Sequence, residues 1–396
     1  MQIQFLIQLV QTLKDNFTLI TQIKTNQILY QFRQQTSNFI MSRFIGVSLF
    51  CFLVLGVNCF NNSTKFNQRP IVGIYTAPST YSKFPGLNYS YIAASYVKFV
   101  ESAGAQAVPI PYDATLDYLD TLFSKINGIL FPGGSVEFTF DDSVDKIFSR
   151  NANYLIQKAK NATNQGDFFP IWGTCQGFEL IHYIESGFNK TVLKSGYNDT
   201  TSHTTNNIDK TSKLFEKMPT FLKRHMENFD YAYYHHDKGV IPQSYQEIPI
   251  LSQNYKYTSI GYTDSQRLFI ATFESINYPI FGTQFHPEKN AFEWKIDAAR
   301  DFKSTLVSQY FANFFIQQAR QNFHSFNGTS DENKYLIYQY PTYSLPTSSY
   351  TEIYILKNFG NPEVDYTQAY VPKAKKSKSL ITKLILENKF EDDEGF

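Results

Sequence analysis

The chain has 396 residues, of which 42% are hydrophobic and 18% are charged, and this balance is ordinary for a globular protein that buries a sizeable core. Its formal net charge at pH 7 is +1, and no basic stripe with interleaved aromatic residues occurs, so the composition argues against a nucleic-acid partner. The length allows one large domain with appendages.

The N-terminal part carries an apolar stretch at residues 44–57, which follows Met41 and ends close to Cys59. Its size and flanks are typical of a secretory signal, and its apolar core is too short for a comfortable membrane span. We therefore predict a signal peptide at 41–59. An N-terminal extension at 1–40 precedes it, unless translation begins at Met41. If the extension is present, an uncleaved membrane anchor is the alternative.

Cleavage of this signal would place the protein in the secretory pathway, bound for a lysosome or vacuole or for the extracellular space, without a stable membrane span. Glycosylation sequons then occur at Asn61, Asn62, Asn88, Asn161, Asn189, Asn198 and Asn327. Cleavage also leaves Cys175 as the single cysteine. A secreted chain that can form no internal disulfide and keeps one thiol is better explained by catalysis than by a structural bridge.

Strand and helix patterns alternate from residue 71 onward. The predicted strands lie at 71–76, 107–110, 128–131 and 169–172, and the predicted helices at 91–102, 116–125, 142–164 and 176–184. This order with apolar strands indicates a mainly parallel sheet covered by helices on both faces, which is a three-layer α/β fold. Ligands of such folds bind at the carboxyl ends of the strands.

The pattern changes after residue 192. Short alternating segments up to residue 272 predict antiparallel strands and loops, a strand follows at 279–285, and a long helix is predicted over 297–322. We assign the catalytic domain to residues 60–355. Residues 356–396, which are lysine-rich and then acidic, are predicted to be a flexible C-terminal extension.

Cys175 lies in a turn of the form G-x-C-x-G, Gly173 to Gly177, between a predicted buried strand and a predicted helix. This arrangement is that of a nucleophile elbow with cysteine in place of serine. The glycines leave room on either side of a strained nucleophile, and the helix N-terminus favours the thiolate over the thiol. The alternative is a core cysteine, which is the usual fate of a lone cysteine after a strand.

His286, Pro287 and Glu288 follow the strand predicted at 279–285. Alternation at the strand end sends residues 286 and 288 the same way, so the imidazole can exchange a proton with Cys175 while the carboxylate holds its tautomer. A lone His-Pro-Glu is usually a turn, but finding it together with the cysteine elbow, each after a predicted strand, predicts a Cys175–His286–Glu288 triad. The chain shows no cysteine and histidine spacing for a metal and no phosphate-binding loop, so we infer neither metal nor cofactor.

Several segments resemble the gamma-glutamyl hydrolases, which cleave folate polyglutamates and belong to the class I glutamine amidotransferase-like superfamily. They are the elbow, and also Arg69 to Ile74, Tyr91 to Lys98, Glu101 to Ala105, Ile126 to Val136, His286 to Lys289 and Glu293 to Lys295. The resemblance runs from about residue 69 to residue 350. It implies the amidotransferase-like form of the three-layer fold, hydrolysis of γ-glutamyl bonds through a cysteine thioester, folate poly-γ-glutamates as substrate, and a homodimer.

The resemblance also indicates further site residues. The backbone amides of Gln176 and Gly134 are predicted to form the oxyanion hole. Glu179, His236 and Tyr96 are predicted to contact the substrate, although His235 next to His236 leaves the register open and a buried core tyrosine is the alternative for Tyr96. The rival functions are a glutamine amidotransferase-type glutaminase and a noncatalytic folate-polyglutamate-binding protein.

Overall fold

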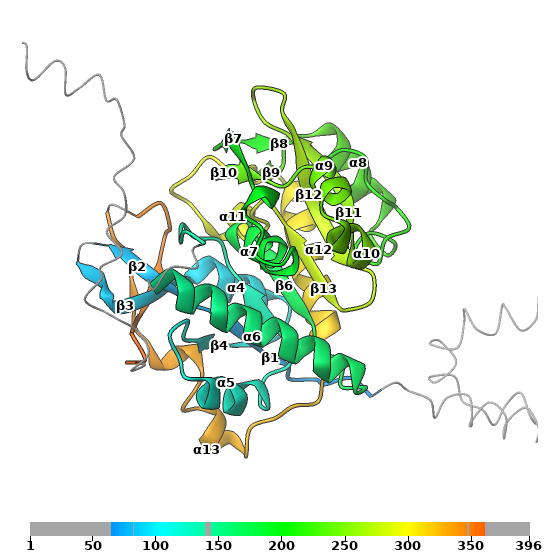
Figure 1. Cartoon of the computed structure of the whole chain (residues 1–396). Helices are drawn as coiled ribbons and strands as arrows, with labels where there is room; N and C mark the ends of the chain where they lie inside the picture. The colour runs from blue at the N-terminus through cyan, green and yellow to red at the C-terminus, as the bar shows by residue number, and fades with distance from the viewer. Residues whose placement is uncertain (1–64, 82, 139–143, 347, 361–396) are drawn as a thin grey trace, which may run out of the picture. The chain divides into compact units, whose positions relative to one another are not determined.

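The structure is a computed structural model, and it describes residues 65–360 except residues 82, 139–143 and 347 (Figure 1). The predicted extension at 1–40, the predicted signal peptide at 41–59 and the segment from 361 to 396 lie outside the described residues. Within the described part, no helix is both long enough and apolar enough to cross a membrane.

A seven-stranded sheet forms the centre of the described part, in the order β11-β12-β13-β6-β5-β1-β4. Five neighbouring strands run parallel: β1 (Ile71–Tyr75), β4 (Gln106–Ile110), β5 (Ile129–Phe131), β6 (Ile171–Thr174) and β13 (Ile280–Thr283). At one edge β12 (Leu268–Ser275) and β11 (Tyr255–Tyr262) continue the sheet in antiparallel fashion. The predicted mainly parallel sheet with an antiparallel addition is therefore confirmed.

Side chains of the sheet strands alternate between two hydrophobic cores, as the pleat requires. Along β1, Ile71 and Tyr75 enter one core while Val72 and Ile74 enter the other. The first core packs against α5 (Leu116–Phe123), α6 (Val144–Asn164) and α7 (Gln176–Glu185). The second core packs against α4 (Ala94–Ser102), α8 (Thr220–Asn228) and α12 (Phe302–Ala319). The sheet is thus covered by helices on both faces.

A second sheet, which is antiparallel and has the order β14-β15-β3-β2, was not predicted. It consists of β2 (Ala77–Tyr81), β3 (Phe84–Ala93), β14 (Thr342–Tyr343) and β15 (Ile353–Lys357). The helix predicted from Tyr91 begins only at Ala94, because residues 91–93 are the end of β3 and pair with β15. β15 also crosses residue 355, where we placed the end of the catalytic domain.

Smaller elements complete the described part. β7 (Lys194–Asp199) pairs with β10 (His236–Gly239), and β8 (Ser202–His203) pairs with β9 (Ala232–Tyr233). The short helices are η1 (Lys190–Val192), α9 (Pro242–Glu247), α10 (Pro249–Asn254), α11 (Lys289–Phe292), α13 (Thr329–Glu332) and η2 (Ile337–Gln339).

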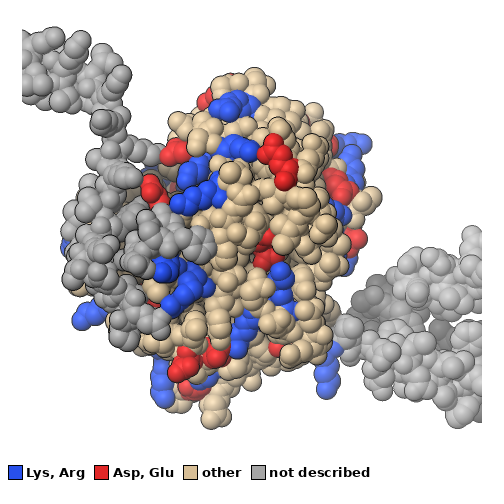
Figure 2. Space-filling model, in the orientation of Figure 1, with Lys and Arg blue, Asp and Glu red and all other residues tan. Residues whose placement is uncertain are grey.

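The long helix predicted from residue 297 begins instead at Phe302. Asp301 caps it, since the carboxylate accepts hydrogen bonds from the backbone amides of Lys303 and Ser304 at 3.0 and 3.2 Å. Figure 2 shows basic and acidic side chains interspersed over the face in view.

Candidate active site

Cys175 occupies the sharp turn between β6 and α7. Its backbone has φ 51° and ψ −108°, a conformation that residues other than glycine rarely adopt. A Cβ on Gly177 would collide with the carbonyl oxygen of Phe131, and a Cβ on Gly173 would come within 2.7 Å of Ile181. The two glycines are therefore required by close packing around the turn, as the elbow interpretation of the sequence predicts.

The thiol of Cys175 is buried, with 4% of the residue exposed. Burial raises the pKa of this thiol well above its ordinary value, Glu179 adds to the increase, and Lys289 and the backbone amide of Gln176 oppose it. The sequence predicts that the helix N-terminus favours the thiolate, and burial of the thiol acts against this effect. The protonated sulfur lies 3.5 Å from the carbonyl oxygen of His235, to which it donates.

His286 lies just beyond the end of β13, and its ring is held from one side. Nδ1 is 2.7 Å from a carboxylate oxygen of Glu288 and 3.2 Å from the hydroxyl of Tyr96. Nε2 is buried and has no hydrogen-bond partner in the described part of the chain. A Cβ built on Gly133 would lie 2.7 Å from Cε1 of His286 and 3.3 Å from Cβ of Cys175, so the imidazole and the cysteine flank the same point.

Burial also sets the charge of the histidine and its carboxylate. It lowers the pKa of His286 well below the ordinary value, with nearby Lys289, His235 and His236 acting in the same direction. It raises the pKa of Glu288 to about 7, although Lys289 opposes the increase. Because charge is disfavoured on the thiol and on the imidazole alike, the resting site is protonated at sulfur and neutral at the ring.

The loop after β5 approaches the elbow with two glycines. The backbone amide of Gly133 donates to the hydroxyl of Tyr96 at 2.7 Å. The side chain of Gln176 donates to the carbonyl oxygen of Val136 at 2.7 Å, which ties the loop to the start of α7. The backbone N–H of Gly134 has no acceptor among the described residues. An unpaired amide beside the elbow is what an oxyanion hole provides.

Cys175 and His286 open into one pocket. Its lining comes from β2 and β3, from segments that follow strands of the central sheet, and from the segment that precedes β15. The lining residues are Thr80, Tyr81, Tyr91, Gly134, Ser135, Cys175, His235, His286, Lys289, Ser348, Ser349 and Tyr350. A thiol, an imidazole with a free nitrogen and a glycine with an unpaired amide therefore line one pocket, as the predicted nucleophile, base and oxyanion hole would require.

Comparison with known proteins identifies the family. A family model described as peptidase C26 matches residues 70–288, and gamma-glutamyl hydrolase B of Dictyostelium discoideum is 32% identical over 81% of this chain and 92% of its own length. This chain belongs to the peptidase C26 family. The gamma-glutamyl hydrolase of Rattus norvegicus is 35% identical, covering 73% of this chain and 90% of that protein. Gamma-glutamyl hydrolase 1 of Arabidopsis thaliana is 30% identical, covering 75% and 85%.

Two predicted substrate residues of this C26 peptidase do not line the pocket. Glu179 is buried on α7 and accepts a hydrogen bond from the side chain of Gln284 at 3.1 Å, and burial raises its pKa to about 7. His236 is buried on β10, with Nδ1 2.8 Å from the carbonyl oxygen of Lys238, and burial lowers its pKa to about 4. Of the two adjacent histidines, His235 is the one that lines the pocket.

Tyr96 is buried as a core tyrosine would be, yet its hydroxyl reaches both the histidine and the glycine loop of the C26 site. Several other pocket residues received no role from the sequence, and Tyr81, Tyr350 and Lys289 are among them. Lys289 directly follows Glu288, so its place next to the predicted triad in the sequence is the signal that could have indicated a role for it.

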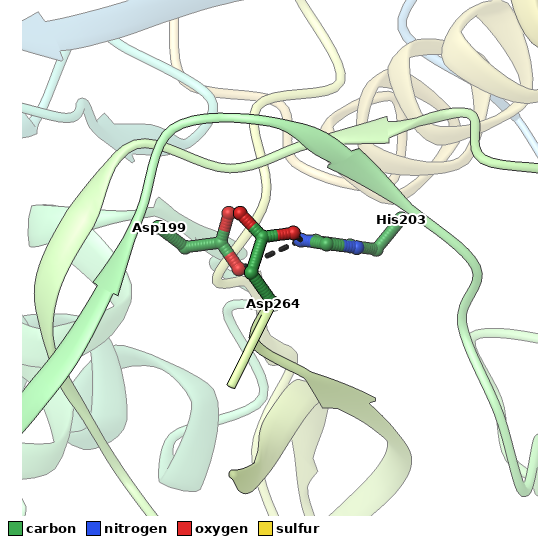
Figure 3. A group of neighbouring side chains, drawn as sticks. All are labelled: Asp199, His203 and Asp264. Atoms are coloured by element: carbon green, nitrogen blue, oxygen red, sulfur yellow. Dashed lines mark ion pairs between the residues drawn. The ribbon is translucent and has the colours of Figure 1, made fainter. Parts of the chain in front are cut away.

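A separate group of potential metal ligands occurs in this C26 peptidase away from the elbow. Ligand atoms of Asp199, His203 and Asp264 lie within 4.8 Å of one another (Figure 3). The sequence reasoning missed this group because it searched for cysteine and histidine spacing. His203 Nε2 is 2.8 Å from Asp199, 3.6 Å from Asp264 and 2.9 Å from the hydroxyl of Thr201, so an ordinary ion pair accounts for the arrangement.

Proposed function

We propose that this C26 peptidase hydrolyses the γ-glutamyl bonds of folate poly-γ-glutamates through a thioester on Cys175. The observation that carries the proposal is the free, buried Nε2 of His286 beside Cys175, with Nδ1 held by Glu288. The similarity to gamma-glutamyl hydrolases from an amoeba, a mammal and a plant supports the substrate class.

Cys175 is the proposed nucleophile, and His286 its base. Sγ attacks the γ-carbonyl carbon while Nε2 takes the thiol proton, and this proton then passes to the leaving amine. We propose that the proton leaves the thiol while Sγ attacks, because burial favours the protonated thiol and the neutral ring in the resting site. Water, activated by the same nitrogen, then cleaves the thioester and releases the acid.

The remaining predicted residues have supporting roles in this proposal. Glu288 orients His286 and stabilises the imidazolium. The amides of Gly134 and Gln176 hold the oxyanion of each tetrahedral intermediate. Tyr96 positions the ring and the glycine loop. Contacts of Glu179 and His236 with the substrate remain predictions, since both side chains lie outside the pocket lining.

The decisive experiment is product analysis by mass spectrometry with the full chain and its Cys175→Ala variant. Each is incubated with pteroyl-penta-γ-glutamate and, separately, with glutamine. We expect shortened folates from the wild type and a loss of at least about 10³-fold in the variant, with an unchanged circular dichroism spectrum. Wild-type rates in the variant would contradict the nucleophile. Ammonia from glutamine with intact folate would indicate the amidotransferase-type glutaminase, and binding of the folate without any product would indicate a binding protein.

We also propose that the enzyme passes through the secretory pathway to a lysosome or vacuole or to the outside of the cell, and that it forms a homodimer. The first proposal is supported by the apolar stretch at 44–57. N-terminal sequencing of the purified protein would test it, since cleavage near residue 59 is expected. Light scattering of the same sample would test the dimer.

A further inference from the structure

Lys289 is a buried cation at the wall of the active-site pocket. It begins α11, directly after the proposed triad, and its backbone amide donates to the carbonyl oxygen of His286 at 3.2 Å. Only 3% of the residue is exposed, yet it lines the same pocket as Cys175 and His286. Among the described residues of that lining, Lys289 is the one lysine and there is no arginine. Burial lowers the pKa of its ammonium, and the nearby Glu288, Cys175 and Glu293 oppose this decrease.

The ammonium of Lys289 forms no ion pair with the described residues, although Glu288 and Glu293 are near enough to favour its charge. Within the described part of the chain, no carboxylate comes within ion-pairing distance of Nζ, and Nζ makes no hydrogen bond. Its neighbours are two aromatic rings, with the centroids of Tyr233 and Tyr350 at 5.0 and 5.4 Å. The nearby carboxylates each use one oxygen elsewhere, because Glu288 holds His286 and Glu293 accepts from the amide of Thr351. Their other oxygens are buried and have no hydrogen-bond partner among the described residues, Lys289 included.

A buried charge without a partner is costly, so a site that keeps one is poised for a ligand of opposite charge. Aromatic rings stabilise the cation only in part. Ser348 and Ser349 line the same pocket, and a serine hydroxyl can donate a hydrogen bond to a carboxylate. The Ser348 hydroxyl already bonds to the hydroxyl of Tyr81 and accepts from the amide of Tyr350.

A γ-glutamyl bond offers such a ligand on each side. The residue whose γ-carbonyl is attacked carries a free α-carboxylate, and the leaving glutamate carries another. We propose that Lys289 forms a carboxylate subsite that binds the α-carboxylate adjacent to the scissile γ-bond. This inference rests on the proposed function, and it gives the pocket a means to recognise an anionic, γ-linked substrate.

The test measures binding separately from turnover. Pteroyl-di-γ-glutamate has a single γ-bond, and two analogues carry an α-carboxamide on the first or on the second glutamate. Affinities of all three are measured by calorimetry for the full-length Cys175→Ala protein with and without Lys289→Gln. We expect Lys289→Gln to weaken the parent ligand about tenfold to hundredfold, as for the loss of a charge-assisted hydrogen bond. It should leave the affinity for one of the two carboxamide analogues unchanged. The position of the carboxamide in that analogue identifies the carboxylate that Lys289 binds.

Equal losses of affinity for the parent and for both carboxamide analogues would overturn the inference. An unchanged affinity for the parent would overturn it as well. Failure of the parent to bind the Cys175→Ala protein, together with no cleavage of the pentaglutamate by the wild type, would instead contradict the proposed function. Lys289→Arg should retain most of the affinity. Lys223→Gln is the matched control, because Lys223 is also buried but lies on α8 and not in the pocket lining.

A second readout separates carboxylate binding from an effect of Lys289 on the thiol. The rate of alkylation of Cys175 by iodoacetamide is measured against pH in the wild type and in Lys289→Gln. Hydrolysis of the parent compound and of its two carboxamide analogues is measured in the same two proteins. If Lys289 served only to favour the thiolate, the variant would lose activity on all three compounds in equal proportion. The subsite predicts a loss that depends on the substrate and exceeds any common factor.

Discussion

At the scale of single residues, the site consists of groups that are neutral at rest and become charged in pairs. Burial raises the pKa of Cys175 and lowers that of His286, so neither ionises by itself. In the proposed mechanism, proton transfer between them creates both charges together, next to Glu288 and the unpaired amide of Gly134. Under this proposal the site stabilises charge where the reaction develops it and disfavours charge in the free enzyme.

Tyr96→Phe tests whether one hydroxyl positions the catalytic ring. The variant loses the acceptor for Gly133 N–H and the contact with His286 Nδ1. We expect kcat/KM to fall about tenfold and the free energy of unfolding to fall by about 1 kcal/mol. Tyr245→Phe is the control, since its buried hydroxyl lies 2.8 Å from Nε2 of a different histidine, His182. It should lose similar stability with full activity. Equal activities of the two variants would refute a positioning role for Tyr96.

At the scale of elements, the strand-to-helix turn was predictable from the sequence while the pocket wall was not. The glycines around Cys175 and the His-Pro-Glu segment are local signals, because close packing and strand alternation act over a few residues. The pairing of β3 with β15 joins Tyr91 to Ile355, which are far apart in the chain. A local pattern cannot indicate such a partner, so Tyr91 was predicted to begin a helix, and Tyr350 was left without a role.

Gly177→Ala tests the packing of the elbow. The added methyl group would collide with the carbonyl oxygen of Phe131, which is backbone and cannot rotate away. We expect a loss of about 1–3 kcal/mol in the free energy of unfolding, together with a large loss of activity, because β5 and α7 must separate. Gly166→Ala provides the comparison. Gly166 has φ +87° with nothing within 4 Å of its Cβ position, so the loss of about 1–2 kcal/mol comes from the backbone alone. Urea titration and turnover of both variants would distinguish the two causes. An active Gly177→Ala enzyme would contradict close packing at the elbow.

At the scale of the whole molecule, the alternation of strands and helices correctly indicated the central sheet and its two helical faces, since the parallel strands are short and mostly apolar and helices alternate with them. The two-histidine segment was harder, because alternation in a short strand does not decide which of His235 and His236 faces the pocket. The ligand group at Asp199 joins β7, β8 and the loop between β11 and β12, and such a meeting of segments is likewise invisible in local sequence.

The Asp199–His203 pair predicts how stability of the molecule depends on pH. The contact with Asp199, whose carboxylate oxygen lies 2.8 Å from Nε2, raises the pKa of His203. Burial raises the pKa of Asp199, but its contacts with His203 and Thr201 outweigh this and leave the pKa below its ordinary value. The stability from a raised histidine pKa is complete below about pH 6.5 and is lost as pH rises through the folded value. The stability from a lowered aspartate pKa is complete above about pH 4 and is lost as pH falls.

Wild type should therefore exceed His203→Gln in free energy of unfolding most clearly between about pH 4 and 6.5. Urea titrations of both proteins at pH 5.5 and at pH 9 would measure the difference. His324→Gln is a suitable control, because His324 also pairs with an aspartate, Asp167, but at a different place in the fold. A difference between wild type and His203→Gln that grows toward pH 9 would show that the pair is not charged.

The lining of the pocket comes from two stretches of the chain. The family match ends at residue 288 and contains Cys175, His286 and Glu288, the proposed triad. Lys289, Ser348, Ser349 and Tyr350 all come later. A substitution among these later residues would therefore change the shape and charge of the pocket without replacing a member of the proposed triad.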